Sequence, residues 1–325
     1  MEKVRKVNGI FKILGILWII GIQTAPAFAQ IKKEIKITPY TIETTYEKLK
    51  KDYPFINPIS PDGIEGINIE EDVVYRTLGK RELKVDIYYP KTNGDQLKPA
   101  VILIHGGGWV SGSKENQRPM AKRLAKEGFV AITVEYRLSL EAPYPAAIID
   151  IKAALDWIKR NAAEYDLDKN KIALLGASAG AQLATLVGVT PGISIYKVND
   201  GEILDEVQAI VNIDGIVSFI HPEAEEGEIA GLWLGGLKSE NPANWKEASP
   251  LEYVNKITPP TIFINSSQPR FHAGRDDMIK ILDANGIYNE VHTIPNTPHS
   301  FWLVHPWFEP TLNYTVDFLN KVFKK

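Results

Sequence analysis

The pentapeptide Gly176-Ala177-Ser178-Ala179-Gly180 places a serine among small residues. Residues 171–175 before it are mostly apolar and strand-like, whereas residues 181–187 after it have the composition of a helix start. A Gly-x-Ser-x-Gly run between a strand and a helix is typical of a nucleophile elbow, a sharp turn that admits only small neighbours and exposes its serine. The pattern predicts Ser178 as a nucleophile, although a small-residue turn with a non-catalytic serine would have the same sequence pattern.

Upstream, residues 101–104 form an apolar run that leads directly into His105-Gly106-Gly107-Gly108-Trp109. A strand followed by such a run supplies backbone N–H groups that can hold the negative oxygen formed when the serine attacks a carbonyl. Glycine is needed there because the backbone itself must approach the substrate closely. The run lacks the Gly-Lys-Ser/Thr ending of a phosphate-binding loop. We therefore assign Gly107, Gly108 and Ala179 to an oxyanion hole.

Together, the two motifs resemble those of α/β-hydrolases in the esterase/lipase group, which includes hormone-sensitive lipase-like and feruloyl or acetyl esterases. The similarity extends from about Leu83 to Phe323 and includes the runs at 134–138 and 143–147. It implies an α/β fold, the α/β-hydrolase fold, in which helices flank both faces of a mostly parallel central sheet. It also implies a serine ester hydrolase that needs no metal and no organic cofactor.

The chain contains six histidines, and His299 has the position expected of a general base. It follows the last expected strand, where the α/β-hydrolase order of serine, acid and histidine puts the base. A serine hydroxyl is a weak nucleophile without such a base. We therefore assign His299 to the activation of Ser178, rather than to a surface or capping role.

The acid departs from the pattern of the resembled family, which usually has an aspartate just after the penultimate strand. Gln268 occupies that position, and a glutamine cannot carry the charge that stabilises an imidazolium. Asp214 follows the strand-like run 209–213, from which it can still reach the histidine. Asp276 lies further along the usual loop, in an expected first helical turn where the helix dipole also stabilises acids. Asp214 is favoured, and Asp276 is the alternative.

A segment beside the expected site carries Arg270, His272 and Arg275. Two arginines can bind the carboxylate of a uronate, or they can pair with nearby acids. The segment resembles one in exported bacterial esterases that deacylate plant polysaccharides, which implies a carbohydrate esterase for acetyl or methyl esters, with pectin as a candidate substrate. Aromatic side chains that can stack on sugars or belong to the core are Trp109, Trp302 and Trp307.

Other functions are compatible with parts of this pattern. A serine peptidase of related fold usually carries an additional propeller or another oxyanion arrangement, and a lipase is disfavoured because no conspicuous apolar lid is apparent. A non-catalytic binding protein on the same scaffold is favoured only by Gln268, because Ser178 and His299 are both retained. The expected partner is therefore a small-molecule or polysaccharide ester.

Strands and helices alternate along most of the chain, as in a mostly parallel sheet. Residues 219–256 interrupt this alternation and are either a surface excursion that packs its own aromatic residues or a lid over the site. The expected elements are an opening hairpin at 73–89, strands at 100–104, 131–136, 172–175, 209–213, 261–264 and 288–294, and helices at 120–127, 146–161, 276–284 and 310–323, with a further helix after Ser178.

The first residues have the pattern of a secretory signal. A basic lead precedes the apolar run 13–22, and Ala27-Phe28-Ala29 is a typical cleavage site. The run is short for a membrane span, so an uncleaved anchor is the less favoured alternative. We expect residues 1–29 to be a signal peptide, 30–70 an extension near the mouth of the site, and 71–325 the catalytic domain.

Composition limits the remaining possibilities. With 325 residues and 44% hydrophobic residues, the chain suits one large globular domain. Without residues 1–29 it carries 33 Lys and Arg against 39 Asp and Glu, which gives no sign of nucleic-acid binding. The absence of cysteine excludes disulfides, thiolate catalysis and cysteine metal sites. We expect a secreted or periplasmic bacterial protein without stable membrane association after cleavage.

Overall fold

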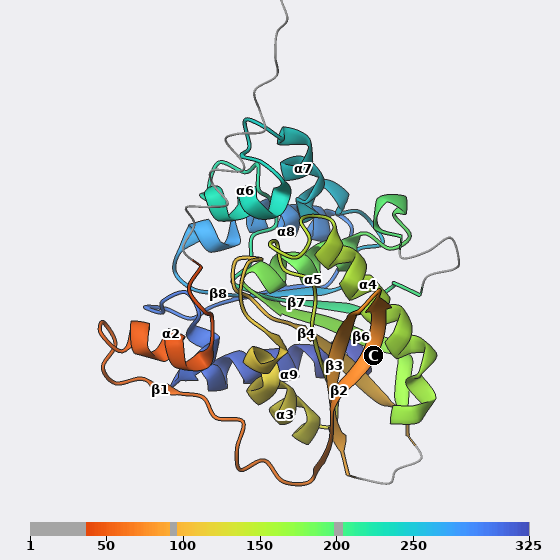
Figure 1. Ribbon diagram of the computed structural model, residues 1–325. Helices are drawn as coiled ribbons and strands as arrows, with labels where there is room; N and C mark the ends of the chain where they lie inside the picture. The colour runs from red at the N-terminus through yellow and green to blue at the C-terminus, as the bar shows by residue number, and fades with distance from the viewer. Residues whose placement is uncertain (1–36, 92–95, 198–203, 325) are drawn as a thin grey trace, which may run out of the picture.

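The computed structural model describes residues 37–91, 96–197 and 204–324 (Figure 1). The predicted signal peptide, residues 1–29, lies outside the described residues, as do the first residues of the predicted extension. Within the described ranges, no helix combines the length and the apolar character needed to cross a membrane.

A sheet of eight strands forms the centre of the molecule. Along the chain they are β2 (Ile67–Leu78), β3 (Arg81–Pro90), β4 (Lys98–Ile104), β5 (Val130–Val134), β6 (Leu167–Ala177), β7 (Ala209–Ile213), β8 (Thr261–Asn265) and β9 (Asn289–Thr293). Their order in the sheet is β2-β3-β5-β4-β6-β7-β8-β9. The pairs β2–β3 and β3–β5 are antiparallel, and every later pair is parallel. All residues of β5, β7 and β8 are buried, as expected for parallel strands covered on both faces.

The predicted fold class and its alternating strands and helices are confirmed, with differences at the element ends. β6 begins at Leu167 rather than at residue 172, because Leu167 pairs with Lys98 ahead of the apolar part of the strand. The polar residues 168–171 hide this extension from a hydrophobic pattern. The opening hairpin likewise starts at Ile67, inside the segment predicted as the N-terminal extension.

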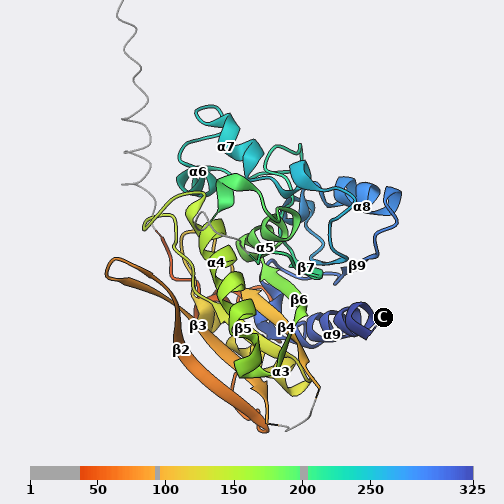
Figure 2. The ribbon, with the colours of Figure 1, turned by 90° about the vertical axis from the view of Figure 1, so that its right-hand side faces the viewer.

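Helices cover both faces of the sheet (Figures 1 and 2). They are α2 (Ile42–Leu49), α3 (Arg118–Lys126), α4 (Ala146–Arg160), α5 (Ala179–Val189), α6 (Glu228–Leu234), α7 (Pro242–Glu247), α8 (Arg275–Ala284) and α9 (Phe308–Lys324). α4, α5 and α8 lie on one face, and α3 and α9 on the other. Side chains of β4 alternate between the two resulting cores: Ile102 packs with residues of α4 and α5, whereas Val101 and Leu103 pack with residues of α3 and α9.

Residues 219–256 leave the sheet between β7 and β8, and they carry α6 and α7 (Figure 1). The interior of this excursion is aromatic. Trp233 stacks on Trp109 with ring centroids 5.1 Å apart, and Phe219 packs against both rings. Trp245 packs edge-on against Phe219. The excursion therefore has its own apolar interior, which Trp109 of the glycine-rich loop completes.

The N-terminal segment packs against the end of the chain. α2 begins with a capping box, in which Thr44 N donates to Thr41 Oγ1 at 3.1 Å and Thr41 N donates to Thr44 Oγ1 at 2.9 Å. The short strand β1 (Asn57–Pro58) pairs with β10 (Val304–His305). The Tyr40 hydroxyl donates to Ser300 Oγ at 3.4 Å. These contacts bring the N-terminal segment beside the residue that follows His299.

Candidate active site

Ser178 occupies the turn between β6 and α5, with φ of 55° and ψ of −124°. The turn leaves no room for side chains on its flanking glycines. A Cβ on Gly176 would lie 2.0 Å from the Gly180 carbonyl oxygen, and a Cβ on Gly180 would lie 2.2 Å from the Ile104 carbonyl oxygen. Ser178 N donates to the Ile213 carbonyl oxygen at 2.8 Å, which fastens the turn to β7. Glycine is required on both sides because a side chain at Gly176 would overlap the first turn of α5 and one at Gly180 would overlap the end of β4.

His299 and Asp214 join Ser178 in one chain of hydrogen bonds. His299 Nε2 lies 2.8 Å from Ser178 Oγ, and His299 Nδ1 lies 2.8 Å from Asp214 Oδ2. Asp214 directly follows β7 and is 1% exposed. Its other oxygen, Oδ1, accepts hydrogen bonds from the backbone N of Ser266 at 2.9 Å and from the Ser266 hydroxyl at 3.1 Å. Both oxygens of the Asp214 carboxylate thus have donors, and the carboxylate is held toward His299.

The alternative acid, Asp276, lies elsewhere. It is in the first turn of α8, where its carboxylate pairs with Arg275 at 2.7 Å and its side chain is 72% exposed. Gln268 N approaches Ser266 Oγ at 3.3 Å. The loop after β8 therefore supports Asp214 through Ser266 and leaves Asp276 in an ion pair of its own.

Backbone strain gathers around Ser178. Among the described residues, seven non-glycine residues have positive φ, and four of these belong to the site: Trp109 at 62°, Ser178 at 55°, Asp214 at 50° and Ser300 at 74°. Such conformations cost of order 1 kcal/mol or more each and persist only where the surrounding structure enforces them. The concentration of this strain at one end of the sheet is independent support for a functional role there.

The glycine-rich loop passes directly beside the nucleophile turn. A Cβ on Gly106 would lie 2.7 Å from the Ala177 carbonyl oxygen, and Gly107 has φ of +116°. Ala179 is the first residue of α5, and the first N–H groups of a helix have no partner within it. Gly108 and Ala179 both line a cavity with Ser178. The backbone at these positions is therefore available to an oxygen held at Ser178.

His105 holds the glycine-rich loop in place through buried contacts. Its ring is 1% exposed and stacks on Tyr136 with centroids 4.3 Å apart, and the Tyr136 hydroxyl donates to the His105 carbonyl oxygen at 2.8 Å. Burial lowers the pKa of His105 to about 4, so the ring is neutral at neutral pH. As a neutral ring it donates its Nδ1–H to the Gly106 carbonyl oxygen, 2.8 Å away. These contacts fix the loop on the sheet.

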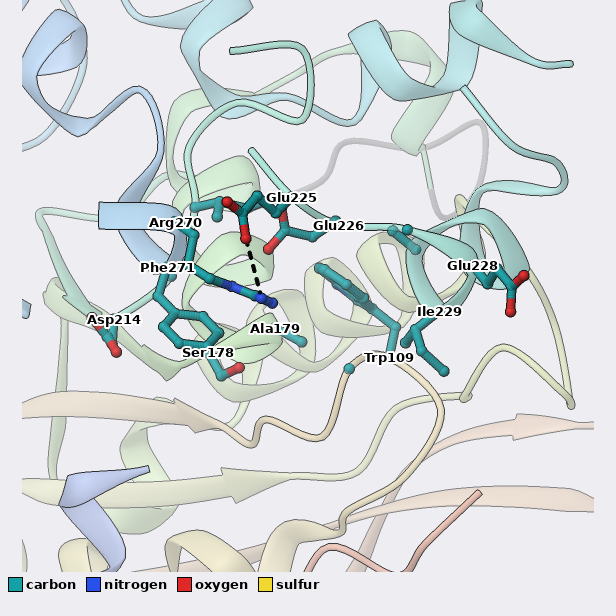
Figure 3. A pocket seen from close by; sticks show the side chains of 15 residues that line it. Trp109, Ser178, Ala179, Asp214, Glu225, Glu226, Glu228, Ile229, Arg270 and Phe271 are labelled. Atoms are coloured by element: carbon teal, nitrogen blue, oxygen red, sulfur yellow. Dashed lines mark hydrogen bonds and ion pairs between the residues drawn. The ribbon is translucent and has the colours of Figure 1, made fainter. Parts of the chain in front are cut away.

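Two cavities meet at Ser178, and both are also lined by Gly108 and Phe271. The first cavity, of about 380 Å³, lies under the excursion (Figure 3). The second cavity, of about 580 Å³, lies against the N-terminal segment. Other residues of the first cavity include Trp109, Ala179, Ile216, Glu225, Glu226, Ile229 and Arg270; those of the second include Pro39, Tyr40, Thr45, Lys48, Gly107, His299 and Ser300.

Of the two alternatives for the tryptophans, stacking on sugars and packing in the core, the structure shows packing. Trp109 lines the first cavity but is only 5% exposed, because it stacks on Trp233 and donates its Nε1–H to Gln182 Oε1 at 3.0 Å. Trp302 is 3% exposed, lines neither cavity and lies edge-on against His299 at 5.1 Å. Trp307 is also buried. Their hydrophobic area is used in packing.

The structure also separates the three polar residues predicted to bind substrate. Arg270 lines the first cavity, where its Nη1 lies 3.4 Å from Glu225 Oε2. Arg275 lies outside both cavities and pairs with Asp276, and it also donates to Asn265 Oδ1 at 2.9 Å. His272 is buried outside both cavities, and this burial lowers its pKa. Of the two alternatives for the arginines, a clamp on a uronate and pairing with nearby acids, the structure shows the pairing for both, and only Arg270 lines a cavity with Ser178.

Phe271 is a site residue that sequence reasoning did not identify. Its ring stacks on the His299 imidazole with centroids 3.6 Å apart and an angle of 11° between planes. Arg270 lies over the same phenyl ring, 4.6 Å from its centroid. The only signal in the sequence was its place between two residues that were noticed for their polarity. Glu225 and Glu226 were also missed individually, although a lid over the site was one of the two alternatives for the excursion that carries them.

The chain is similar in sequence to known esterases. The family model for BD-FAE matches residues 85–282. The probable carboxylic ester hydrolase LipM of Mycobacterium tuberculosis is 28% identical over 235 residues, 70% of this chain, and the chain spans about half of LipM, 52% of its length.

Two solved structures share the fold. A truncated carbohydrate esterase from gut microbiota is 24% identical, with a TM-score of 0.65 over 83% of this chain and 100% of the other. A bifunctional GH43-CE protein of Bacteroides eggerthii is 27% identical, with a TM-score of 0.66 over 78% of this chain and 38% of the other. The predicted resemblance to α/β-hydrolase esterases is confirmed.

Proposed function

The chain belongs to the BD-FAE family of α/β-hydrolase esterases, and from this premise we propose that it is a serine carboxylic-ester hydrolase acting through Ser178, His299 and Asp214. The observation that carries the proposal is the chain of two 2.8 Å hydrogen bonds from Ser178 Oγ through His299 to Asp214. A nucleophile, a base within hydrogen-bond reach and a group that orients the base are the requirements for nucleophilic catalysis by serine.

In the proposed reaction, His299 Nε2 takes the proton of Ser178 Oγ as the oxygen attacks the ester carbonyl. Asp214 accepts the Nδ1–H of His299 and stabilises the imidazolium that forms. The negative oxygen of the tetrahedral intermediate is held by backbone N–H groups of Gly107, Gly108 and Ala179.

The intermediate then collapses. The alcohol leaves with the proton that His299 returns, and an acyl group remains bonded to Ser178 Oγ. Water, activated by the same histidine, attacks this acyl-enzyme and releases the acid. No step requires a group beyond these residues and water.

We further propose that the ester belongs to a carbohydrate. Two structural relatives are a carbohydrate esterase and a GH43-CE protein, which supports this substrate class. The first cavity also suits a polar ligand, because Glu225, Glu226 and Arg270 share its wall with apolar residues. The pectin hypothesis relied on a resemblance and on two arginines that could bind a uronate, and of these two only Arg270 lines a cavity with Ser178.

The test uses protein without residues 1–29, with Ser178→Ala as control. Both are incubated with acetylated xylan, acetylated pectin and methyl-esterified pectin, and released acetate and methanol are quantified. Serine-dependent acetate or methanol supports a carbohydrate esterase, and the polymer identifies the preferred class. If neither polymers nor 4-nitrophenyl acetate are hydrolysed, the ester hydrolase proposal fails, and a binding role for the scaffold replaces it.

Export remains a proposal from the sequence. The basic lead, apolar run and Ala27-Phe28-Ala29 site predict removal of residues 1–29 and a secreted or periplasmic product. Expression of the full chain in a bacterial host, followed by N-terminal sequencing of protein from the extracytoplasmic fractions, tests it. A mature end at Gln30 is expected, and intact protein confined to the cytoplasm would contradict export.

A further inference from the structure

Gln182 is a buried polar residue on the helix that follows the nucleophile. All residues of α5 are buried, and Gln182 and Thr185 are the two with polar side chains. The Thr185 hydroxyl donates within its own helix, to the Ala181 carbonyl oxygen at 2.7 Å. The Gln182 amide instead contacts two segments outside the helix. Because a buried amide is costly unless both of its ends are hydrogen-bonded, these contacts indicate why a polar residue is present there.

Both ends of the Gln182 amide have partners. Its Oε1 accepts the Nε1–H of Trp109 at 3.0 Å, and its Nε2 donates to the Ala248 carbonyl oxygen at 2.8 Å. An indole nitrogen can only donate and a carbonyl oxygen can only accept, so the two partners allow one orientation of the amide. Trp109 belongs to the glycine-rich loop, and Ala248 follows α7 in the excursion. Gln182 therefore connects α5 to both.

This connection joins the two sides of the proposed oxyanion hole. Trp109 directly follows Gly108 in the loop, and Gln182 lies about one helical turn beyond Ala179 in α5. Trp109 and Ala179 both line the first cavity (Figure 3). The Gln182 backbone N donates to the Ser178 carbonyl oxygen at 3.1 Å, so the glutamine is part of the turn that begins at the nucleophile. Its side chain therefore restricts the separation between the N–H groups of Gly108 and Ala179.

The other contacts of Trp109 do not fix this separation. Its φ of 62° is a strained conformation that persists only where the surrounding structure enforces it. Its carbonyl oxygen accepts from Ser139 N at 2.9 Å and from Ser139 Oγ at 2.8 Å, and its ring stacks on Trp233 of the excursion. Among its hydrogen bonds within the described residues, the one to Gln182 is the one that reaches α5. The position of the loop against the nucleophile helix thus depends on this glutamine.

We propose that Gln182 is a positioning residue of the oxyanion hole, which holds Trp109, and with it Gly108, at the correct distance from Ala179. This inference rests on the proposed ester hydrolase function and adds a residue to its site. Oxyanion donors act only if they are in place before the negative charge develops, and a misplacement of about 1 Å can lower the rate about 100-fold. An amide suits this role because it presents an acceptor and a donor on one planar group.

The experiment compares three variants with 4-nitrophenyl acetate as the substrate. Gln182→Met keeps an unbranched side chain of similar length but has no donor and only a weak acceptor. Gln182→Glu keeps the shape of the side chain. Thr185→Val is the matched control, because it removes a buried hydroxyl of the same helix whose partners are Ala181 and Asn212. Exhaustive labelling with a fluorophosphonate counts the active serines, so that kcat refers to folded enzyme. The affinity for a trifluoromethyl ketone, whose adduct with Ser178 carries an oxyanion, is measured alongside.

Gln182→Met is expected to lower kcat per labelled serine about 10- to 100-fold, somewhat less than the outright loss of an oxyanion donor. The affinity for the ketone should fall by a similar factor, and KM should stay within about threefold, because the lost interaction belongs to the transition state. Thr185→Val should stay within about twofold of wild type in kcat. A purely structural role of Gln182 would reduce the number of labelled serines and leave both kcat per serine and ketone affinity unchanged.

That result would overturn the inference and leave the esterase intact. A wild-type protein that neither hydrolyses the ester nor reacts with the fluorophosphonate would instead remove the proposed function itself.

Gln182→Glu supplies a second test, which holds even where Gln182→Met fails to fold. A protonated carboxyl group has an O–H donor and an acceptor, as the amide does, whereas a carboxylate has acceptors only. Position 182 is 0% exposed, and such burial raises the pKa of a carboxyl group placed there. The kcat of Gln182→Glu, divided by the wild-type value at the same pH, should therefore be within about threefold of one near pH 5.5 and fall about tenfold by pH 9.

Division by the wild-type value removes the pH dependence that the two proteins share. A ratio that stays constant over this range overturns the inference. A falling ratio combined with an unchanged kcat in Gln182→Met assigns the effect to the buried charge, which overturns it as well.

Discussion

Two regions meet at Ser178, and they differ in how far the hydrogen bonds of their polar groups are satisfied. At the carboxyl ends of β6 and β7, the site is closed and satisfied: Asp214 is 1% exposed and accepts three hydrogen bonds of 2.8–3.1 Å. The wall of the first cavity that Glu225 and Glu226 of the excursion form with Arg270, here called the excursion wall, is looser. Its Arg270–Glu225 contact is 3.4 Å long between half-exposed side chains, and Glu226 Oε2 has no hydrogen-bond partner among the described residues.

The difference follows from what each region must do. In the proposed mechanism, groups at the strand ends act on the bond that all esters share, so their geometry can be complete before a substrate arrives. We propose that groups of the excursion wall contact the part of the substrate that varies from one ester to another. Changes at the strand ends should therefore affect every ester alike, whereas changes in the wall should separate one ester from another.

The largest effect is expected for Ser178→Ala. Removal of the nucleophile should lower kcat about 10⁵-fold or more on every ester, with residual activity from the oxyanion hole alone. Position 178 has φ of 55°, and alanine is strained there as serine is. Because the substitution leaves this strain unchanged, the melting temperature should stay close to that of wild type. Steady-state kinetics on an aryl ester measure kcat, and thermal unfolding measures the melting temperature. Retention of more than about 1% of activity would contradict the assignment.

Asp214→Asn should come next, with a loss of about 10⁴-fold in kcat, because an asparagine neither holds the correct tautomer of His299 nor stabilises its charged form. Asp276→Asn is the matched control and should stay within about twofold of wild type. The same kinetic assay separates the two aspartates. A large loss of kcat in Asp276→Asn, together with retained activity in Asp214→Asn, would show that Asp276 in α8 is the acid of the triad.

The buried ring of His105 should make the closed region sensitive to acid. Its pKa is about 4 in the folded protein against an ordinary 6.5, so the unfolded chain binds a proton first as the pH falls. Stability from this group is complete above about pH 6.5 and declines toward pH 4, by about 2 kcal/mol at pH 5. His105→Asn should lose about 2 kcal/mol less than wild type between pH 7 and pH 5 in urea unfolding. Equal losses would contradict the neutral buried ring.

Phe271 contacts both regions, since it lines the first cavity beside the excursion wall and stacks on His299 at the strand ends. We expect Phe271→Leu to lower kcat about fivefold on every ester, because a stacked pair of this kind contributes about 0.5–1.5 kcal/mol to holding the ring. Phe55→Leu, at a 61% exposed phenylalanine, is the control. An effect on KM alone, without a change in kcat, would assign Phe271 to substrate binding rather than to positioning the base.

The smallest effect is expected in the excursion wall. Arg270 and Glu225 are 44% and 65% exposed, and such pairs contribute less than about 1 kcal/mol to stability. Arg270→Gln and Glu225→Gln, alone and together in a double-mutant cycle, should therefore leave the free energy of unfolding nearly unchanged. A coupling energy above about 2 kcal/mol would show that this wall is as rigid as the strand ends.

The local motifs of the site were readable because each one is enforced by contacts close in sequence or by backbone sterics. Gly176 and Gly180 must be glycine where a Cβ would lie 2.0–2.2 Å from a carbonyl oxygen, and a serine between them marks the turn. Strands β7 and β8 are continuous apolar runs because both of their faces are covered, so their bounds were predicted to within one residue. The polar residues at the start of β6 do not form an apolar run, so the sequence did not predict that the strand begins at Leu167.

What the sequence by itself determined was the α/β architecture, the nucleophile turn and the glycine-rich loop, since periodicity and steric exclusion are local properties of the chain. Only the tertiary structure decided which side chains from distant segments meet. It brought Asp214 rather than Asp276 within 2.8 Å of His299, buried Trp302, paired Arg275 with Asp276 and stacked Phe271 on the imidazole. Each of these outcomes depends on loop paths across the ends of the strands, and charge or aromatic character alone does not specify a path.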